Sequence, residues 1–205
     1  MKLLIAGGTG FLGRQLIATA LEKGHQVTYL GRHQAKGSVF ARQQVTFLEA
    51  DLLKDNHLDL SSYGFDLMID CVGAIKPSQL DKLNVQATKS AIKICQESHV
   101  KHFVYISASG GYPAYVRSKR RAEELVKSSG INYLIVRPGL LFGADRPKTI
   151  FQAWVLRFLL GLPFIGPKLK HLAPVSTIEL ANKIFAALEN EIPNTLLTYE
   201  PQKNP

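Results

Sequence analysis

Tyr115 and Lys119 are the two residues whose types and spacing most directly suggest proton transfer. Residues four positions apart share one face of an α-helix, so the Lys119 ammonium is expected to lie near the Tyr115 hydroxyl and favour the phenolate. A phenol whose pKa is lowered from about 10 toward 7 can donate or accept a proton at neutral pH. The alternative is a surface tyrosine beside a solvated lysine, and the position of the pair in the fold decides between the two.

A second chemical signal is the glycine-rich loop near the N-terminus, which contains GxGxxG from Gly8 and GxxGxxG from Gly7. A buried strand is expected before it and a helix after it. Glycines at such a turn let the backbone and the helix N-terminus approach a pyrophosphate, so the loop predicts a dinucleotide site rather than a turn without a ligand. The loop residues expected to contact the cofactor are Gly7, Thr9, Gly10, Phe11, Leu12 and Gly13.

The residues after the second and third expected strands favour NADP over NAD. An NAD site usually presents an acidic residue to the ribose hydroxyls at the end of the second strand, whereas this chain has Arg32 there. A guanidinium can pair with a 2′-phosphate, the alternative being a solvated loop cation. Asp51, after the third strand, is placed either to accept a hydrogen bond from the adenine amino group or to cap a helix.

Strand and helix signals alternate along the chain, which implies parallel strands joined by right-handed crossovers. We predict an α/β fold with a doubly wound, mostly parallel Rossmann-type sheet, helices on both faces and a single domain over residues 1–205. The carboxyl ends of the strands meet at one edge, so the glycine loop, the serines at 107 and 109 and the Tyr115–Lys119 pair come together there. The expected strands are 2–6, 26–30, 45–49, 67–70, 102–107 and 133–137, and the expected helices are 11–23, 79–98, 114–128, 150–160 and 177–189.

In this order the motifs resemble the short-chain dehydrogenase/reductase superfamily, in its extended or atypical branch, over about residues 1–190. Within that branch the chain is similar to small relatives of a respiratory complex I accessory subunit and of a coenzyme Q assembly protein. The resemblance rests on the glycine loop, Asp51-Leu52, Cys71-Val72-Gly73, Asn84, residues 107–109, Tyr115 with Lys119, and Arg137-Pro138-Gly139.

The resemblance implies an NAD(P)-binding fold in which Tyr115 transfers a proton and Lys119 binds the nicotinamide ribose. It also implies a serine or threonine that polarises the substrate oxygen. The family's usual position for that hydroxyl falls on Ala108, so Ser107 or Ser109 must supply it or it is absent. Besides the loop and Arg32, the residues then expected at the cofactor are Asp51, Leu52, Cys71, Val72, Gly73, Lys119 and Pro138.

Three functions are compatible with these residues. The first is an NADP-dependent oxidoreductase that moves a hydride between nicotinamide and a small or lipophilic, quinone-like carbonyl or alcohol. The alternative is a non-catalytic NADP-binding sensor or assembly factor, which Ala108 favours. A sugar-nucleotide epimerase or dehydratase is less favoured, because residues 144–175 form a region much smaller than the substrate lobe of such enzymes.

Residues 144–175, which we call the cap, are expected to form a small apolar cap or lid. The segment 150–160 is apolar on more than one face. A helix of this kind is expected either to pack over the sheet edge or to cover a lipophilic substrate, meet a membrane surface or bind a partner. In the latter cases its basic residues would face phosphates; these are Arg157, Lys168, Lys170 and His171.

The net charge and the cysteine count limit the binding partners and the cellular compartment that we expect. The net charge of +9 predicts attraction to polyanions, but the chain lacks a nucleic-acid-binding motif and the spacing of metal ligands. Its two cysteines and the absence of a signal-like N-terminus predict a cytoplasmic protein, with peripheral membrane contact through the cap and an oligomer both compatible. Helical spacing predicts surface ion pairs between Arg120 and Glu124 and between Glu123 and Lys127.

Overall fold

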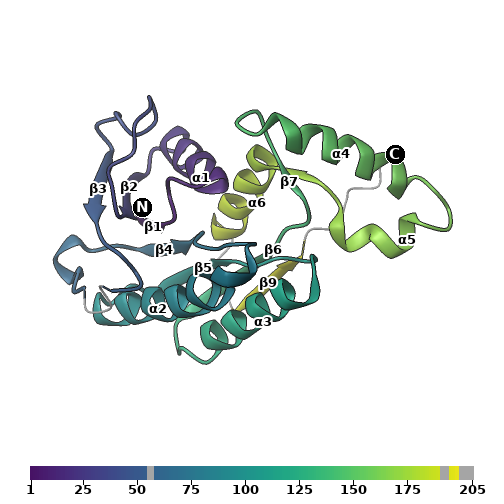
Figure 1. Ribbon diagram of the computed structural model, residues 1–205. Coiled ribbons are helices and arrows are strands. Elements are labelled where there is room, and N and C mark those ends of the chain that lie inside the picture. Colours follow the sequence, from purple (N-terminus) through teal and green to yellow (C-terminus); the bar gives the residue numbers. More distant parts are fainter. Residues whose placement is uncertain (55–57, 190–193, 199–205) are drawn as a thin grey trace.

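The computed structural model describes residues 1–54, 58–189 and 194–198. A sheet of seven parallel strands forms its centre (Figure 1). The strands are β1 (Lys2–Ala6), β2 (Gln26–Gly31), β3 (Val45–Glu49), β4 (Leu67–Asp70), β5 (His102–Ile106), β6 (Asn132–Arg137) and β9 (Thr195–Thr198). Their order is β3-β2-β1-β4-β5-β6-β9, so the predicted doubly wound α/β fold is confirmed.

Two helical layers cover the sheet. Helices α1 (Phe11–Glu22) and α6 (Thr177–Glu189) lie on one face, and α2 (Ala87–Glu97) and α3 (Pro113–Lys127) lie on the other (Figure 1). Side chains alternate along each strand, so in β1 Leu3 and Ile5 pack toward α1 and α6 whereas Leu4 and Ala6 pack toward α2 and α3. Burial on both faces explains the continuous apolar runs of the strands.

Local signals set several helix ends. The helix α1 ends before Gly24, whose φ of +75° is the left-handed conformation that commonly stops a helix. At the start of α6 the Glu179 amide donates to the Ser176 hydroxyl over 3.1 Å, so Ser176 caps this helix.

The expected regular helix at 79–98 is only partly correct. The chain makes a 3₁₀ turn at Pro77–Gln79 and then a π turn at Lys82–Gln86 before α2 begins. A π turn inserts one extra residue into a helix and often marks a functional site. Here the Asn84 carbonyl accepts from the Tyr105 hydroxyl at 3.4 Å, and the Thr88 hydroxyl, whose proton goes to the nearer Asp70 carboxylate, lies 3.3 Å away.

The cap stands to one side of the sheet (Figure 1). Its elements are α4 (Pro147–Leu160), α5 (Gly166–Leu169) and a 3₁₀ turn at Lys170–Leu172. A short two-stranded sheet joins the cap to the rest of the chain, with β7 (Leu141–Phe142) parallel to β8 (Val175–Ser176). Of the 14 residues in α4 only Ala153 is buried, which argues against one of the two expected arrangements, the packing of this helix over the sheet edge. None of the helices in the described ranges is both long enough and apolar enough to cross a bilayer.

Candidate functional site

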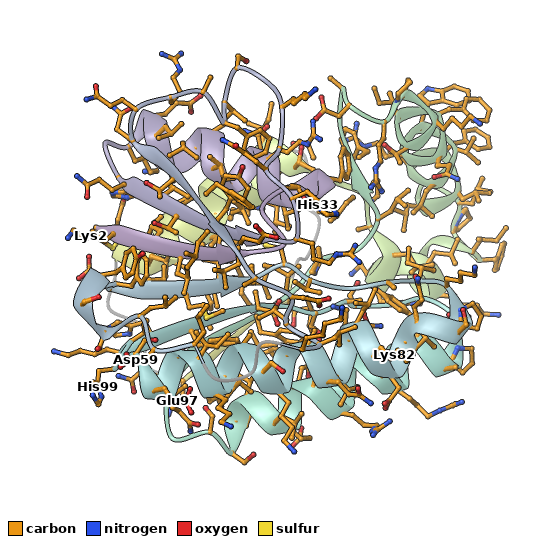
Figure 2. The ribbon with its side chains drawn as sticks, turned by 60° about the vertical axis from the view of Figure 1, so that its left-hand side comes forward. Lys2, His33, Asp59, Lys82, Glu97 and His99 are labelled. Carbon is orange, nitrogen blue, oxygen red and sulfur yellow. The ribbon has the colours of Figure 1, made fainter. Side chains whose placement is uncertain are left out.

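The predicted site residues follow strands whose carboxyl ends lie at one edge of the sheet. Figure 2 shows Lys2 at the start of β1 on the opposite edge from His33, which follows β2. The strand order reverses between β1 and β4. In an open α/β sheet ligands bind outside the carboxyl ends at this switch point, which places the glycine loop after β1 at its centre.

At Gly7 and Gly13 the glycine loop is packed too closely to accept a side chain. A Cβ on Gly13 would lie 2.3 Å from the Gly7 carbonyl oxygen and 2.7 Å from the Gly8 Cα. Gly7 has a φ of +76°, and its own Cβ would lie 2.9 Å from the Cys71 carbonyl carbon. Thr9 and Gly10 are exposed at the tip of the loop. The glycines therefore leave the backbone amides at the start of α1 accessible from the loop, and such amides can bind a pyrophosphate.

The two residues that follow the loop have different surroundings. Leu12 is buried and belongs to the core, so it offers a ligand only its backbone amide. The Phe11 ring lies 4.7 Å below the Arg146 guanidinium, and a Cβ on Gly143 would lie 3.2 Å from it. Phe11 thus connects the glycine loop with the start of the cap.

Arg32 lies exposed directly after β2. Across the described ranges of the chain it makes neither a hydrogen bond nor an ion pair. Its loop is folded back because the Ala35 amide donates to the Tyr29 hydroxyl over 3.0 Å. After β3, the Asp51 carboxylate accepts from the Leu53 amide at 3.1 Å within a turn, and Leu52 is buried.

Asp70, at the end of β4, is a buried carboxylate that the motifs did not single out. It accepts from the Val72 amide at 2.9 Å and from the Thr88 hydroxyl at 2.8 Å. Burial raises the pKa of Asp70, an effect that these hydrogen bonds and the charge of Lys119 oppose. Burial, with the charge of Asp70, also raises the pKa of the Cys71 thiol, which makes Cys71 an unreactive wall of the site.

Asn84, in the π turn, ties this loop to α3. Its Oδ1 accepts from the Ala74 amide at 2.8 Å, and its Nδ2 donates to the Ala74 carbonyl at 3.0 Å and to the Ser118 hydroxyl at 2.9 Å. A Cβ on Gly73 would lie 2.9 Å from Lys119 Nζ and 3.0 Å from Asn84 Oδ1. Gly73 is therefore small enough to let both side chains approach the loop.

Lys119 is a buried cation, 4% exposed. Its Nζ donates to the Ile106 carbonyl at 2.9 Å and lies 4.9 Å from the centre of the Tyr105 ring. Burial lowers the pKa of Lys119 to about 8, although the charge of Asp70 raises it in part. Lys119 thus still carries its charge at neutral pH, at the carboxyl end of β5.

Tyr115 is half-buried against Gly111, whose Cβ would lie 2.7 Å from the Tyr115 ring. Burial raises the pKa of Tyr115, and the neighbouring Tyr112, with its ring centre 6.0 Å away, raises it further. In the protein without cofactor the phenolate is not favoured, because the Lys119 ammonium donates to the end of β5 and Tyr115 is desolvated. The expected lowering of this pKa needs the positive nicotinamide ring as well, and it stays a prediction for the protein with cofactor bound. Tyr115 is a neutral phenol, the form that can donate a proton.

Both candidate serines make hydrogen bonds within the protein. The buried Ser107 hydroxyl donates to Glu123 and accepts from Arg120 Nη1 at 3.2 Å. The Ser109 hydroxyl lies 2.9 Å from the Pro138 carbonyl oxygen and also contacts that of His171 in the cap. A single hydroxyl proton serves one of these carbonyls at a time.

Glu123 lies at the centre of a buried ion network. It pairs with Arg120 at 2.5 Å and with Arg137, whereas Lys127 pairs with Glu124 at 2.7 Å, so the expected surface pairs are wrong. The reason is that Glu123 is 0% exposed and shares the inward face of α3 with Lys119. Burial raises the pKa of Glu123, but hydrogen bonds from Arg137 and Ser107 outweigh burial and hold this pKa below the ordinary value.

This geometry agrees with the comparison to protein families. A family described as NAD(P)H-binding matches residues 7–155, which is more than half of the chain. The chain belongs to the NAD(P)H-binding family. The resemblance to the short-chain dehydrogenase/reductase superfamily is thereby confirmed, and with it a dinucleotide cofactor of the NAD(P) type.

Two curated relatives are similar to this chain over part of their length. The chain is 29% identical over 143 residues to photosystem II assembly factor Ycf39 of Cyanophora paradoxa, covering 67% of this chain and 44% of that protein. It is 26% identical over 152 residues to the ceramide reductase of Caulobacter vibrioides, covering 71% and 48%. The chain thus spans less than half the length of each relative.

The structure of a UDP-glucuronic acid 4-epimerase from Bacillus cereus in complex with NAD aligns with a TM-score of 0.73. It is 18% identical in sequence, and the alignment covers 99% of this chain and 79% of that one. At this level of identity the alignment supports the Rossmann-type fold of the present chain.

Two site residues of this NAD(P)H-binding protein lie outside the recognised motifs but are marked by their positions in the sequence. Asp70 ends an otherwise apolar strand, which is an unusual place for a carboxylate. Glu123 follows Lys119 by four positions and so shares its helix face. Asn84 belonged to the family resemblance, but its contact with Ser118 depends on the π turn, for which the sequence gives no signal.

Removing the charge of Glu123 is expected to destabilise the NAD(P)H-binding fold. Glu123→Gln should lower the free energy of unfolding by about 3 kcal/mol at pH 7, the lower end of the usual range, because Arg137 and Arg120 lose a buried anionic partner but are themselves partly exposed. The folded-state pKa of Glu123 is lowered, so its contribution is present above the unfolded pKa and is lost as the pH falls through the folded value. Urea unfolding of both proteins should show the difference shrinking in acid.

Glu124→Gln is the matched control for this variant. Glu124 is the next residue along α3 and its side chain is 69% exposed in the pair with Lys127. The change in its unfolding free energy should stay below about 0.5 kcal/mol. Equal losses in the two variants would argue against the buried network as a source of stability.

Proposed function

We propose that this protein is an NADP-dependent reductase that passes a hydride to a small or lipophilic carbonyl, including quinone-like compounds. The observation that carries this proposal is one sheet edge that holds both a closely packed glycine loop and a neutral Tyr115 on the same helix as a buried Lys119. The first element fits a dinucleotide and the second fits proton transfer.

The residues at this edge fit an NADP molecule. The backbone amides at the start of α1, next to Thr9 and Gly10, would hold the pyrophosphate. Arg32 would pair with the 2′-phosphate, and Lys119 would bind the nicotinamide ribose. Walls of the site would come from Asp51, Leu52, Cys71, Val72, Gly73 and Pro138, which follow β3, β4 and β6. The cofactor, when bound, supplies the hydride.

The chain's own chemistry in this proposal is the delivery of one proton. The carbonyl carbon gains the hydride while its oxygen takes the proton from the Tyr115 hydroxyl, which then recovers a proton from solvent. The raised pKa of Tyr115 keeps the acid form present at neutral pH, which favours reduction over alcohol oxidation. Lys119, whose ammonium points to the end of β5, would act here by holding the nicotinamide ribose and by adding a positive charge to the occupied site.

A lipophilic substrate is supported by two observations. The cap exposes several aromatic side chains, and its His171 carbonyl contacts the Ser109 hydroxyl beside the Tyr115 loop. The similarity to a protein named ceramide reductase adds a relative whose named substrate is a lipid.

A second candidate function is a non-catalytic assembly factor that binds NADP. Ala108 occupies the position where the family resemblance expects a hydroxyl, and Ser107 is committed to Glu123. The relative named as a photosystem II assembly factor supports this alternative. It predicts cofactor binding without turnover.

Calorimetric titrations with NADPH and NADH at one ionic strength test both candidates. The reductase is expected to bind NADPH tightly and to oxidise it in the presence of short-chain quinones or medium-chain aldehydes. Tight binding with no turnover on any of these would favour the assembly factor. Binding of neither dinucleotide would contradict both functions.

Arg32 is the residue expected to select NADP. Arg32→Ala should weaken NADPH binding by about tenfold or more, since a charge-assisted hydrogen bond contributes about 1.5–3 kcal/mol, and leave NADH binding unchanged. The matched control is Arg42→Ala, which removes another exposed arginine from the segment between β2 and β3. A parallel loss for both dinucleotides, or the same loss in the control, would show that Arg32 acts only through general charge.

A further inference from the structure

The outer face of α4 is an exposed apolar stripe. Ile150, Phe151, Trp154 and Phe158 are 46%, 67%, 67% and 65% exposed. Their spacing places them within about 100° around the helix, so they share one face. The rings of Phe151 and Trp154 stack with their centres 6.4 Å apart, so the stripe is already assembled in the free protein.

The inner face of α4 is apolar as well. It packs within the cap through the buried Ala153 and the half-buried Leu156 and Leu160. A helix that is apolar on both sides normally lies inside a protein, because exposed aromatic surface is unfavourable in water. The turn after the helix extends the apolar surface with Phe164, which is 87% exposed. The outer face of the cap therefore requires a covering surface.

The charges around this stripe identify the kind of surface. Among lysines, arginines and acidic residues, the cap holds Arg146, Lys148, Arg157, Lys168 and Lys170 against one acid, Asp145. All six are exposed, and the whole chain carries a net charge of +9. A second copy of the chain would bring two such positive regions together, which opposes self-association. An anionic surface would be attracted to it.

We propose that the cap binds the surface of an anionic lipid bilayer, inserting the Ile150–Phe158 stripe at the headgroup boundary while the basic residues of the cap contact lipid phosphates. Phenylalanine and tryptophan beside lysine and arginine are typical of helices that lie in this interface. The stripe lies on a single protruding helix, and a bilayer accepts such a ridge without a matching groove. Each cation near an anionic membrane adds about 1 kcal/mol of attraction.

This surface is joined directly to the candidate site. The Leu140 amide donates to the Leu172 carbonyl over 3.2 Å, and a Cβ on Gly110 would lie 2.4 Å from the Leu172 side chain. The cap thus touches the loop that precedes Tyr115 and, through Arg146, the Phe11 ring beside the glycine loop. Docking on a bilayer would hold the carboxyl edge of the sheet next to lipids. The membrane contact itself does not depend on cofactor binding or turnover.

Trp154 makes the proposal directly measurable, because it is the single tryptophan of the chain. Its emission is expected to shift to shorter wavelength when vesicles of equal parts phosphatidylglycerol and phosphatidylcholine are added in low-salt buffer. Pure phosphatidylcholine vesicles should give a much smaller shift. Co-sedimentation should fall strongly in about 1 M salt, where the Debye length is only about 3 Å.

The double variant Phe151→Gln with Phe158→Gln keeps Trp154 as the reporter. It should bind the anionic vesicles at least tenfold more weakly. Ile178→Gln is the matched control, because Ile178 is 57% exposed but lies on α6 outside the cap. Its vesicle binding should equal that of the parent, and circular dichroism should show the same helix content in all three proteins.

Two results would overturn the proposal. The first is the absence of both a Trp154 shift and co-sedimentation with anionic vesicles in low salt. The second is a concentration-dependent dimer, seen by sedimentation velocity without lipid, that the Phe151/Phe158 double variant abolishes; this would assign the stripe to a second copy. Both measurements are independent of NADPH, so failure of the reductase proposal would not be mistaken for failure of this one.

Discussion

Tyr115→Phe is expected to lower NADPH-dependent turnover by about 100- to 1,000-fold, within the usual contribution of a positioned general acid. The substitution removes only the hydroxyl that would protonate the substrate oxygen. The ring still fills its place against Gly111, so the fold and the site walls should remain. Calorimetry should give an NADPH dissociation constant within about twofold of the parent value, since about 0.4 kcal/mol is the most that such a change represents.

The control for this variant is Tyr63→Phe. Tyr63 is 41% exposed and ends the 3₁₀ turn Ser61–Tyr63 before β4, at the amino edge of the sheet, where the hydroxyl has no role in the proposed reaction. Its turnover should match the parent. Equal activity of Tyr115→Phe and the parent would remove Tyr115 from the mechanism, whereas loss of NADPH affinity in Tyr115→Phe would show a positioning role instead.

The pH dependence of the reaction follows from the same two side chains. Because the pKa of Tyr115 is raised, its acid form persists throughout the neutral and mildly alkaline range. Lys119, with a pKa of about 8, loses its charge in that range. A fall in the reduction rate above about pH 8 would therefore report Lys119 rather than Tyr115.

The parts of the site that the sequence predicted are those set by short-range spacing and by the parallel topology. The loop from Gly7 to Gly13 has its required residues within one turn, and its position after a buried strand fixes which edge it occupies. The same topology brings Lys119 to the end of β5, because α3 follows that strand and packs back on it. These relations need no knowledge of individual side-chain conformations.

The parts that the sequence could not predict depend on burial and on which of several partners a side chain selects. Helical spacing predicted an ion pair between Glu123 and Lys127. The packing of α3 instead buries Glu123, which pairs with Arg137 at the end of β6. The pKa of Tyr115 depends on desolvation by the loop around Gly111, and a positive charge four residues away does not determine it.

The exposure of the helix in the cap is another feature that the sequence could not predict. Composition correctly indicated that residues 150–160 are apolar on more than one face. Whether such a helix is covered depends on where the following chain goes. Here the chain returns through α5 to pair β8 with β7, which leaves the outer face of α4 open. The sequence alone does not encode that path in any local signal.

Gly13→Ala is expected to abolish tight dinucleotide binding and to destabilise the fold by about 1–3 kcal/mol, the usual range for side chains forced into a packed interior. A methyl group at this position would lie 2.3 Å from the Gly7 carbonyl oxygen and 2.9 Å from the Gly8 carbonyl carbon. Both neighbours are backbone atoms, so relief requires α1 to move away from the loop. That movement would displace the amides proposed to hold the pyrophosphate. Calorimetry with NADPH and urea unfolding measure the two effects.

Gly24→Ala separates this steric effect from the general cost of replacing a glycine. Gly24 ends α1 with a φ of +75°, and a Cβ there would meet nothing within 4 Å. Its replacement should cost about 1–2 kcal/mol through the left-handed backbone alone and leave NADPH affinity unchanged. The two variants should therefore differ little in stability but strongly in cofactor binding, because Gly13 alone lies where α1 meets the loop. Unaltered NADPH affinity in Gly13→Ala would mean that the cofactor is held elsewhere, and the glycine loop would then be a packing feature only.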